Sequence, residues 1–285
     1  MRCRLMALDV DGTLVGPDNV VTGDIIEAVT LADRAGIGIC LATGRSYGET
    51  IGIWEQLGLD RRRQPMILIG GALVSETDTR RALYHKPMDS ETVCRFSDAL
   101  GAAGYCAMAI VDAWRYDVEY YLTEHGDFID AQRRWFSQMD VNVQSVASLG
   151  DVLLEPDGPD VLRISAVVDE NDGPSLAADL KEQFGDAVNI CSILAPNYDV
   201  WIVEAHAAGA DKRTALQYVA QASRTPMSEV VAVGDDVNDI SMLGSVGLGV
   251  AMPQAPPSVI EASDHTACGG LAEFICQLVD GQFDC

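Results

Sequence analysis

The chain has 285 residues, 48% of them hydrophobic, and a formal net charge of −24 at pH 7. This length allows one large domain or two ordinary ones with buried cores. Such an acidic chain repels the phosphates of nucleic acids and of anionic membranes, which argues against either as its main partner.

Strand and helix signals alternate through the first third of the chain. Short apolar runs predict buried strands over residues 3–10, 36–42 and 66–74, the last of them interrupted by Gly70 and Gly71. Helical spacing of apolar residues predicts helices over 22–35 and 47–57. This order is typical of a parallel sheet with right-handed crossovers.

The pattern changes in the middle of the chain and then returns. Half-polar strands at 162–168 and 188–194, with helices at 90–103 and 174–184, predict an α+β layer. The last third again indicates an α/β pattern, with elements at 201–204, 211–223, 230–233, 247–250 and 271–279. We therefore predict an α/β core of residues 1–85 and 195–285, with an α+β domain of residues 86–194 inserted into it.

Asp9 and Asp11 come directly after the first predicted strand, in the segment DVDGT. Residues two apart on a strand point to one face, so these carboxylates would repel each other unless a cation lay between them. Ligands of open α/β sheets bind beyond the carboxyl ends of the strands. A solvated turn is the alternative, since Asp and Gly favour turns; the remaining motifs favour a functional pair.

Three further groups lie at strand ends or helix starts. Thr43 and Gly44 follow the second strand, where a hydroxyl and a backbone amide can cradle a phosphate. Lys212 begins a helix, although a cation there opposes the helix dipole. The acidic segment 235–239 follows the strand at 230–233 and offers the oxygen ligands that suit Mg²⁺. Each group alone has an ordinary structural explanation, but together they supply the parts for metal-assisted phosphoryl transfer.

These motifs resemble those of the haloacid dehalogenase superfamily, specifically the Cof-type phosphatases with a C2B cap (subfamily IIB). The matching segments are LDVDGTL (8–14), LATGR (41–45), GADKRTAL (209–216), GDDVNDISML (234–243) and GVAM (249–252). They span both ends of the chain, and the segment between them has the length expected of that cap. The resemblance implies a Rossmann-like core with an inserted α+β cap that closes over the site and selects the leaving group.

The resemblance also implies an activity and a set of catalytic residues. The protein would be a Mg²⁺-dependent phosphatase of a small phosphorylated metabolite, such as a sugar phosphate or a phosphorylated cofactor. Asp9 would be the nucleophile that forms an aspartyl-phosphate, and Asp11 the general acid and then the base. Asp9, the Asp11 carbonyl and Asp235 would hold Mg²⁺, and Lys212 would neutralise charge. Asp239 would orient either Lys212 or a metal-bound water.

The phosphoryl group would be held by Thr43, the amide of Gly44 and Asn238. Arg45 follows this cradle and either reaches the substrate or pairs with nearby acids. Three positions depart from the usual family pattern without removing a catalytic group: Gly70 and Gln254, which replace asparagines, and Arg213, where a glycine often follows the lysine.

Two other functions stay open: a phosphomutase of the phosphomannomutase type, which shares the DVDGT motif and the cap class, and a regulatory or binding protein that kept the fold. The eight cysteines form no C-x-x-C pair, which favours reduced thiols over a zinc site. No apolar run approaches the roughly 20 residues of a membrane-spanning helix. We expect a soluble, cytoplasmic protein whose oligomeric state the sequence does not indicate.

Overall fold

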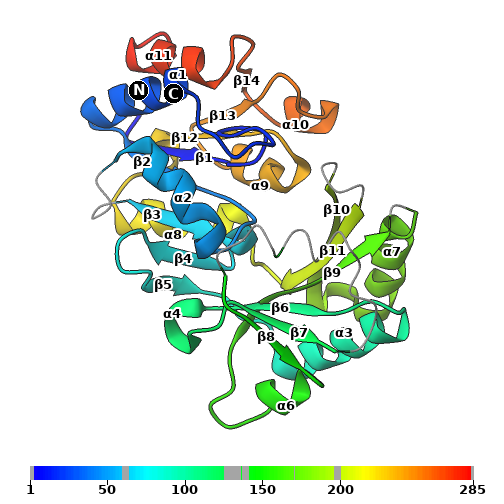
Figure 1. Cartoon of the computed structure of the whole chain (residues 1–285). Coiled ribbons are helices and arrows are strands. Elements are labelled where there is room, and N and C mark those ends of the chain that lie inside the picture. The colour runs from blue at the N-terminus through cyan, green and yellow to red at the C-terminus, as the bar shows by residue number, and fades with distance from the viewer. Residues whose placement is uncertain are drawn as a thin grey trace. The chain divides into compact units, whose positions relative to one another are not determined.

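The computed structural model describes residues 3–59, 64–124, 136, 141–169, 171–195 and 200–283. The chain forms two compact units, which we call the core unit (Met1–Tyr84 and Asp211–Cys285) and the inserted unit (His85–Ala210) (Figure 1). Among the described residues, no helix is both long enough and apolar enough to cross a membrane.

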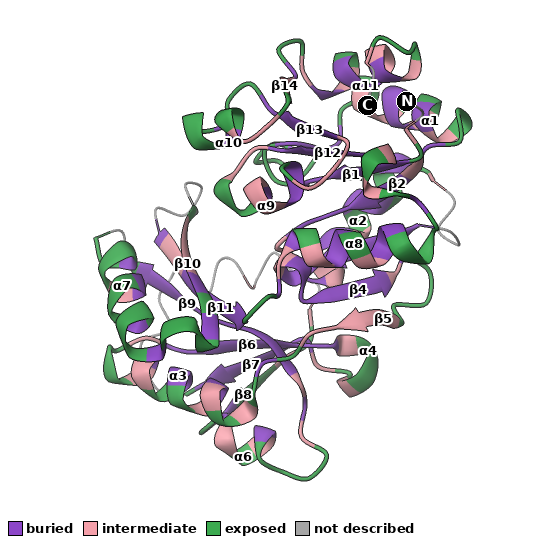
Figure 2. Cartoon of the chain, turned by 180° about the vertical axis from the view of Figure 1, so that it is seen from behind, coloured by how far each residue is buried: buried purple, intermediate pink, exposed green. Residues whose placement is uncertain are grey.

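A five-stranded parallel sheet forms the centre of the core unit, in the order β14-β13-β12-β1-β2. Its strands are β1 (Leu5–Leu8), β2 (Gly38–Leu41), β12 (Val230–Gly234), β13 (Leu248–Ala251) and β14 (His265–Thr266). The four longer strands are almost entirely buried (Figure 2), as expected for strands with helices on both faces. Leu8 aligns with both Val233 and Leu41, so three neighbouring strands end at one edge of the sheet.

Helices cover both faces of this sheet (Figure 1). On one face, α1 (Gly23–Arg34) packs against α11 (Leu271–Val279), and α2 (Tyr47–Leu57) contacts α1. On the other face lie α8 (Lys212–Ala222), α9 (Ile240–Leu243) and α10 (Pro257–Glu261). Of the short 3-10 helices, η4 (Met227–Glu229) directly precedes β12 and η5 (Val237–Asp239) directly precedes α9. Leu216 and Met242 from these helices pack against Ala7, Cys40 and Ala232 of the sheet.

The prediction of one strand over residues 66–74 is wrong, because the chain reverses at the glycines that interrupt it. β3 (Pro65–Leu68) and β4 (Leu73–Glu76) pair antiparallel around the 3-10 turn η2 (Ile69–Gly71), and β5 (Ala82–His85) extends this three-stranded sheet. The φ angles of Ile69, Gly70 and Gly71 are 50°, 62° and 98°. Glycine adopts such angles without steric cost, and a Cβ on Gly71 would collide with the backbone of Asp211.

The inserted unit is built on a six-stranded sheet in the order β10-β11-β9-β6-β7-β8. Its strands are β6 (Met108–Val111), β7 (Tyr120–Thr123), β8 (Val143–Val146), β9 (Val161–Asp169), β10 (Val188–Ala195) and β11 (Val200–Ala207). The helices α3 (Ser90–Ala102) and α7 (Gly173–Phe184) pack on one face of this sheet (Figure 1), with the shorter α4 (Ala113–Tyr116), α6 (Gly150–Leu153) and η3 (Gly185–Ala187) elsewhere in the unit. The predicted fold class, a parallel α/β core with an α+β insertion, is confirmed.

The structure divides the chain after Ala210, whereas we predicted a division after residue 194. The segment 201–204, expected in the core, belongs to β11 of the inserted unit. β11 pairs antiparallel with β10 from Val188↔Ala207 to Ala195↔Val200 and with β9 on its other side. Two long strands close in sequence form a hairpin, and this local pairing keeps both in one sheet. The first boundary lies between Tyr84 and His85, one residue before the predicted one.

Candidate active site

The sheet topology brings three predicted groups to one edge. Asp9 follows β1, Thr43 follows β2, and Asp235 follows β12. Backbone hydrogen bonds continue one residue past the strands: the Asp9 N–H donates to the Val233 carbonyl at 3.0 Å, and the Ala42 N–H donates to the Leu8 carbonyl at 2.8 Å. Residues far apart in the sequence thus meet where parallel α/β sheets place their ligands.

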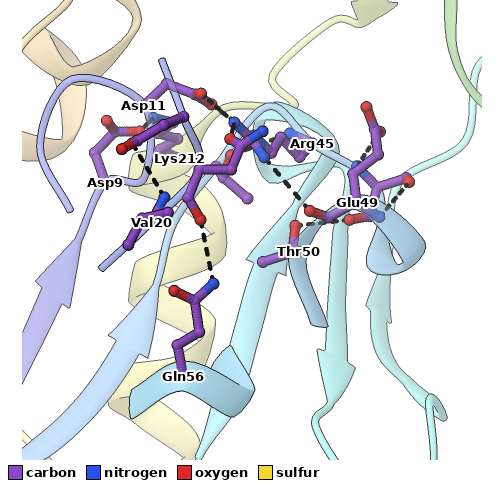
Figure 3. Close-up of polar contacts among 12 residues, drawn as sticks. Asp9, Asp11, Val20, Arg45, Glu49, Thr50, Gln56 and Lys212 are labelled. Atoms are coloured by element: carbon purple, nitrogen blue, oxygen red, sulfur yellow. Dashed lines mark hydrogen bonds and ion pairs between the residues drawn. The ribbon is translucent and has the colours of Figure 1, made fainter. Parts of the chain in front are cut away.

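Lys212 lies beside Asp9 at this edge (Figure 3). Its Nζ donates to Asp9 Oδ1 and to Asp239 Oδ1, both at 2.7 Å, and its side chain is only 1% exposed. Burial alone would lower the pKa of Lys212, but the charges of Asp239 and Asp9 outweigh it and hold the pKa above its ordinary value. The two carboxylates therefore stabilise a buried ammonium at a helix start, where the helix dipole opposes it.

Asp239 joins this lysine to the acidic loop. While its Oδ1 accepts from Lys212, its Oδ2 accepts from the backbone N–H groups of Asp235 at 3.1 Å and Asp236 at 3.2 Å. A Cβ on Gly234 would collide with the Asp239 carboxylate, so glycine is needed before the loop. Asp239 thus fixes both the ammonium and the loop that presents Asp235.

Asp9, Asp235 and Asp239 form a group that could hold a metal ion. Each offers one carboxylate oxygen, and these oxygens all lie within 4.8 Å of one another. Burial, reinforced by the charges of Asp239 and Asp236, raises the pKa of Asp235 to about 6. Burial also raises the pKa of Asp9 above its ordinary value, against the opposing effect of Lys212. A cation would relieve this crowding, and carboxylate oxygens are ligands that Mg²⁺ prefers.

The turn after Asp9 fits closely against Asp235. Gly12 has a φ angle of +77°, and a Cβ there would collide with the Asp235 carboxylate. The Thr13 hydroxyl donates a hydrogen bond to Asp235 Oδ1, with 3.4 Å between the two oxygen atoms. Gln254 Nε2 donates to the Gly12 carbonyl, a contact that the sequence reasoning missed because Gln254 was known only as a departure from the usual pattern.

The predicted phosphate cradle lies beside this group in the core unit. Thr43 is fully buried, and its Oγ1 accepts from the Arg45 N–H at 3.1 Å. Gly44 is half-buried, and among the described residues its Cβ position meets open space. Asn238 lies in η5 with its side chain exposed. Gly70 has the left-handed φ angle that asparagine also tolerates, which explains how either residue fits there.

Asp11 differs from Asp9 in its surroundings. Its side chain is 60% exposed and turns toward Arg45, whose Nε donates to Asp11 Oδ2 at 2.9 Å and whose Nη2 donates to Asp11 Oδ1 (Figure 3). Of the two readings that the sequence left open for Arg45, the structure shows the pairing with an acid. No sequence signal identified which acid it would be.

The structure therefore combines a parallel α/β core with a candidate site of carboxylates and a buried lysine at the carboxyl edge of its sheet. The family model of the haloacid dehalogenase-like hydrolases matches residues 6–269. The chain belongs to this family, which confirms the predicted superfamily and the predicted class of enzyme, a hydrolase.

Three relatives illustrate the range of this family. The chain is 26% identical over 279 residues to the 5-amino-6-(5-phospho-D-ribitylamino)uracil phosphatase YitU of Bacillus subtilis, covering 95% of this chain and 96% of YitU. It is 26% identical over 294 residues to the pyridoxal phosphate phosphatase YbhA of Escherichia coli, covering 96% of this chain and 98% of YbhA. The solved structure of BT4131, a sugar phosphatase of subclass IIB, superposes with a TM-score of 0.75 at 19% identity, covering 96% and 98%.

Proposed function

We propose that this protein is a Mg²⁺-dependent phosphatase that releases phosphate from a small phosphorylated metabolite through an aspartyl-phosphate on Asp9. The observation that carries the proposal is the buried Lys212, held at 2.7 Å from both Asp9 and Asp239 at the carboxyl edge of the sheet. A structural role alone gives no reason to bury two carboxylates and an ammonium beside a third carboxylate, because burying charges is costly.

In the first half of the reaction, a carboxylate oxygen of Asp9 attacks the phosphorus atom and forms an O–P bond. The bond from phosphorus to the leaving oxygen breaks, and Asp11 gives that oxygen its proton. Lys212 holds Asp9 in place and offsets negative charge on the carboxylate and the phosphoryl group. Thr43, the Gly44 amide and Asn238 bind phosphoryl oxygens.

In the second half, Asp11 takes a proton from a water molecule, which attacks the phosphorus atom and frees Asp9 and inorganic phosphate. Asp9, the Asp11 carbonyl and Asp235 would hold Mg²⁺, which when bound supplies positive charge to the phosphoryl oxygens. We assign Asp239 to Lys212 and the acidic loop, because both of its oxygens already accept hydrogen bonds from these groups.

The relatives support an inference about the substrate class. YitU is named for 5-amino-6-(5-phospho-D-ribitylamino)uracil, YbhA for pyridoxal phosphate, and BT4131 as a sugar phosphatase. We infer a substrate of this size and kind, a phosphomonoester of a cofactor-related compound or of a sugar. The acidity of the chain supports a small substrate over a nucleic acid.

A phosphate-release screen over phosphorylated metabolites tests the proposal, with Mg²⁺ or with EDTA. We expect turnover of at least one phosphomonoester with Mg²⁺, none with EDTA, and none by a folded Asp9→Asn variant. Activity retained by that variant would rule out the aspartyl-phosphate. An isomerised product without free phosphate would instead identify a phosphomutase, and inactivity on the whole panel would favour a binding protein.

A further inference from the structure

Arg45 holds the Asp11 carboxylate from two directions. Its Nε donates to Oδ2 at 2.9 Å and its Nη2 to Oδ1, so one guanidinium contacts both oxygens (Figure 3). The exposed fraction of the Arg45 side chain is 20%, against 60% for Asp11. A half-buried arginine thus fixes an exposed carboxylate at the rim of the site.

The guanidinium is itself held by neighbouring segments of the core unit. Its Nη1 donates to the Glu49 carbonyl of α2 at 3.5 Å, and its Nη2 also donates to Asn19 Oδ1. The loop that carries Asn19 is tied to α2 in turn, because Gln56 Nε2 donates to the Asn19 carbonyl at 3.2 Å and Gln56 Oε1 accepts from the Val21 N–H at 2.9 Å. The position of Arg45 is therefore set by α2 and by this loop.

A short exposed side chain samples several rotamers unless something holds it. The planar fork of arginine matches a carboxylate at two points and restricts both its position and its rotation. A proton donor works only within hydrogen-bond reach of the atom that it serves, and a displacement of about 1 Å can lower a rate about 10²-fold. Fixing Asp11 therefore has a direct consequence for proton transfer.

We propose that Arg45 is a positioning residue that holds Asp11 where it gives a proton to the leaving oxygen. The inference rests on the proposed function, in which Asp11 is that donor. It separates Arg45 from Thr43 and Gly44, which follow the same strand but bind phosphoryl oxygens. An arginine that instead bound the phosphoryl group directly would affect all substrates alike.

Aryl phosphates distinguish these roles. p-Nitrophenolate leaves readily without a proton, whereas phenolate and p-methoxyphenolate leave less readily and depend more on one. We therefore compare kcat/KM for p-nitrophenyl, phenyl and p-methoxyphenyl phosphate in the wild type, Asp11→Asn, Arg45→Met and Arg81→Met. The ratio kcat/KM reports phosphoryl transfer to Asp9 even where hydrolysis of the intermediate limits kcat.

We expect Arg45→Met to lower kcat/KM for p-methoxyphenyl phosphate about 10²-fold while p-nitrophenyl phosphate changes less than about threefold. Asp11→Asn should show the same selectivity to a greater degree. Arg81→Met is the matched control, because Arg81 also pairs with a carboxylate, that of Glu76, at 2.5 Å but on the β4–β5 hairpin. It should leave all three values unchanged.

Two other outcomes separate the inference from the proposed function. Selective loss in Asp11→Asn with equal loss on all substrates in Arg45→Met would overturn the positioning role and leave Asp11 as the donor. An absence of selectivity in Asp11→Asn would overturn the donor role itself. Partial unfolding does not obscure the result, because the ratio between two substrates is independent of the folded fraction.

A second variant checks the same inference with the arginine intact. Asn19→Gly removes the Oδ1 that Arg45 contacts, and glycine accepts the φ angle of 57° at this position. We expect Asn19→Gly to lower kcat/KM more for p-methoxyphenyl phosphate than for p-nitrophenyl phosphate, but by a smaller factor than Arg45→Met does. An unchanged substrate ratio in both Asn19→Gly and Arg45→Met would refute the role.

Discussion

Replacing Lys212 by methionine should destabilise the fold as well as remove activity. The substitution keeps an apolar stem but leaves Asp9 and Asp239 facing each other without the ammonium that lies 2.7 Å from each. At an effective dielectric constant of about 20, one such contact is worth about 6 kcal/mol before the cost of desolvation. Because breaking a buried pair leaves an uncompensated charge, we expect a net loss of about 3–5 kcal/mol in the free energy of unfolding at pH 7.

The loss should become smaller at lower pH. The pKa of Asp9 in the folded protein is already raised by burial, and Lys212 is the main group that lowers it. Without Lys212 that pKa rises further, so the folded variant binds a proton that the unfolded chain does not. A raised pKa contributes stability at low pH that is lost as pH rises through it. The difference in the free energy of unfolding between variant and wild type should therefore be smaller at pH 5 than at pH 7.

Denaturant unfolding in EDTA, at pH 5 and pH 7, measures both effects. Lys181→Met is a suitable control, because Lys181 is exposed on α7 and its replacement should change stability by less than about 0.5 kcal/mol. A Lys212→Met protein within about 1 kcal/mol of wild type at pH 7 would refute this account of the buried group. A loss of unfolding free energy that is equal at pH 5 and pH 7 would also refute this account.

Three further changes test other parts of the site. Gly12→Ala should lower phosphatase activity at least about 10²-fold, because its methyl group displaces Asp235; Gly23→Ala, whose Cβ meets open space among the described residues, should not. The rise in Tm caused by Mg²⁺ should be larger at pH 7.5 than at pH 5.5, because the pKa of Asp235 is about 6 and a proton competes with the cation; equal shifts would contradict this. Asp239→Asn should reduce the free energy of unfolding by about 1–3 kcal/mol in denaturant titrations, because an amide cannot serve both Lys212 and the loop; a wild-type value would exclude the anchoring role.

The sequence was sufficient to predict the strands that carry the site. Asp9, Thr43 and Asp235 each follow a short apolar run, and parallel strands place their carboxyl ends at one edge. The hydrogen bonds of Lys212 to Asp9 and Asp239 agree with that reasoning. The unfavourable position of Lys212 at a helix start is what suggests a role in the site. The structure shows two carboxylates, those of Asp9 and Asp239, that compensate for this unfavourable position.

Other features depend on pairings that the sequence pattern does not encode. An apolar run does not reveal its partner strand or its direction. The sequence therefore predicts the segment of β11 as part of the core, and the run 66–74 as one strand interrupted by two glycines rather than as a hairpin. A left-handed φ angle at Ile69 is rare for a β-branched residue and gives no sequence signal. The contact of Arg45 with Asp11 joins residues 34 positions apart through side chains alone. Such contacts follow from the tertiary structure rather than from local preference.

The charges of the site explain why a cation belongs to the proposed mechanism. Among the described residues, the ionisable groups named for this edge of the core unit are Asp9, Asp11, Asp235, Asp236, Asp239, Lys212 and Arg45. With all seven charged, five negative groups against two positive ones leave a formal charge of −3, and a phosphomonoester adds nearly two more negative charges. The chain as a whole carries −24 and offers no general attraction for such a substrate. Because both cations are already paired with carboxylates, a divalent ion among the carboxylates is the simplest source of the missing charge, which favours a strict requirement for Mg²⁺ over a merely stimulatory effect.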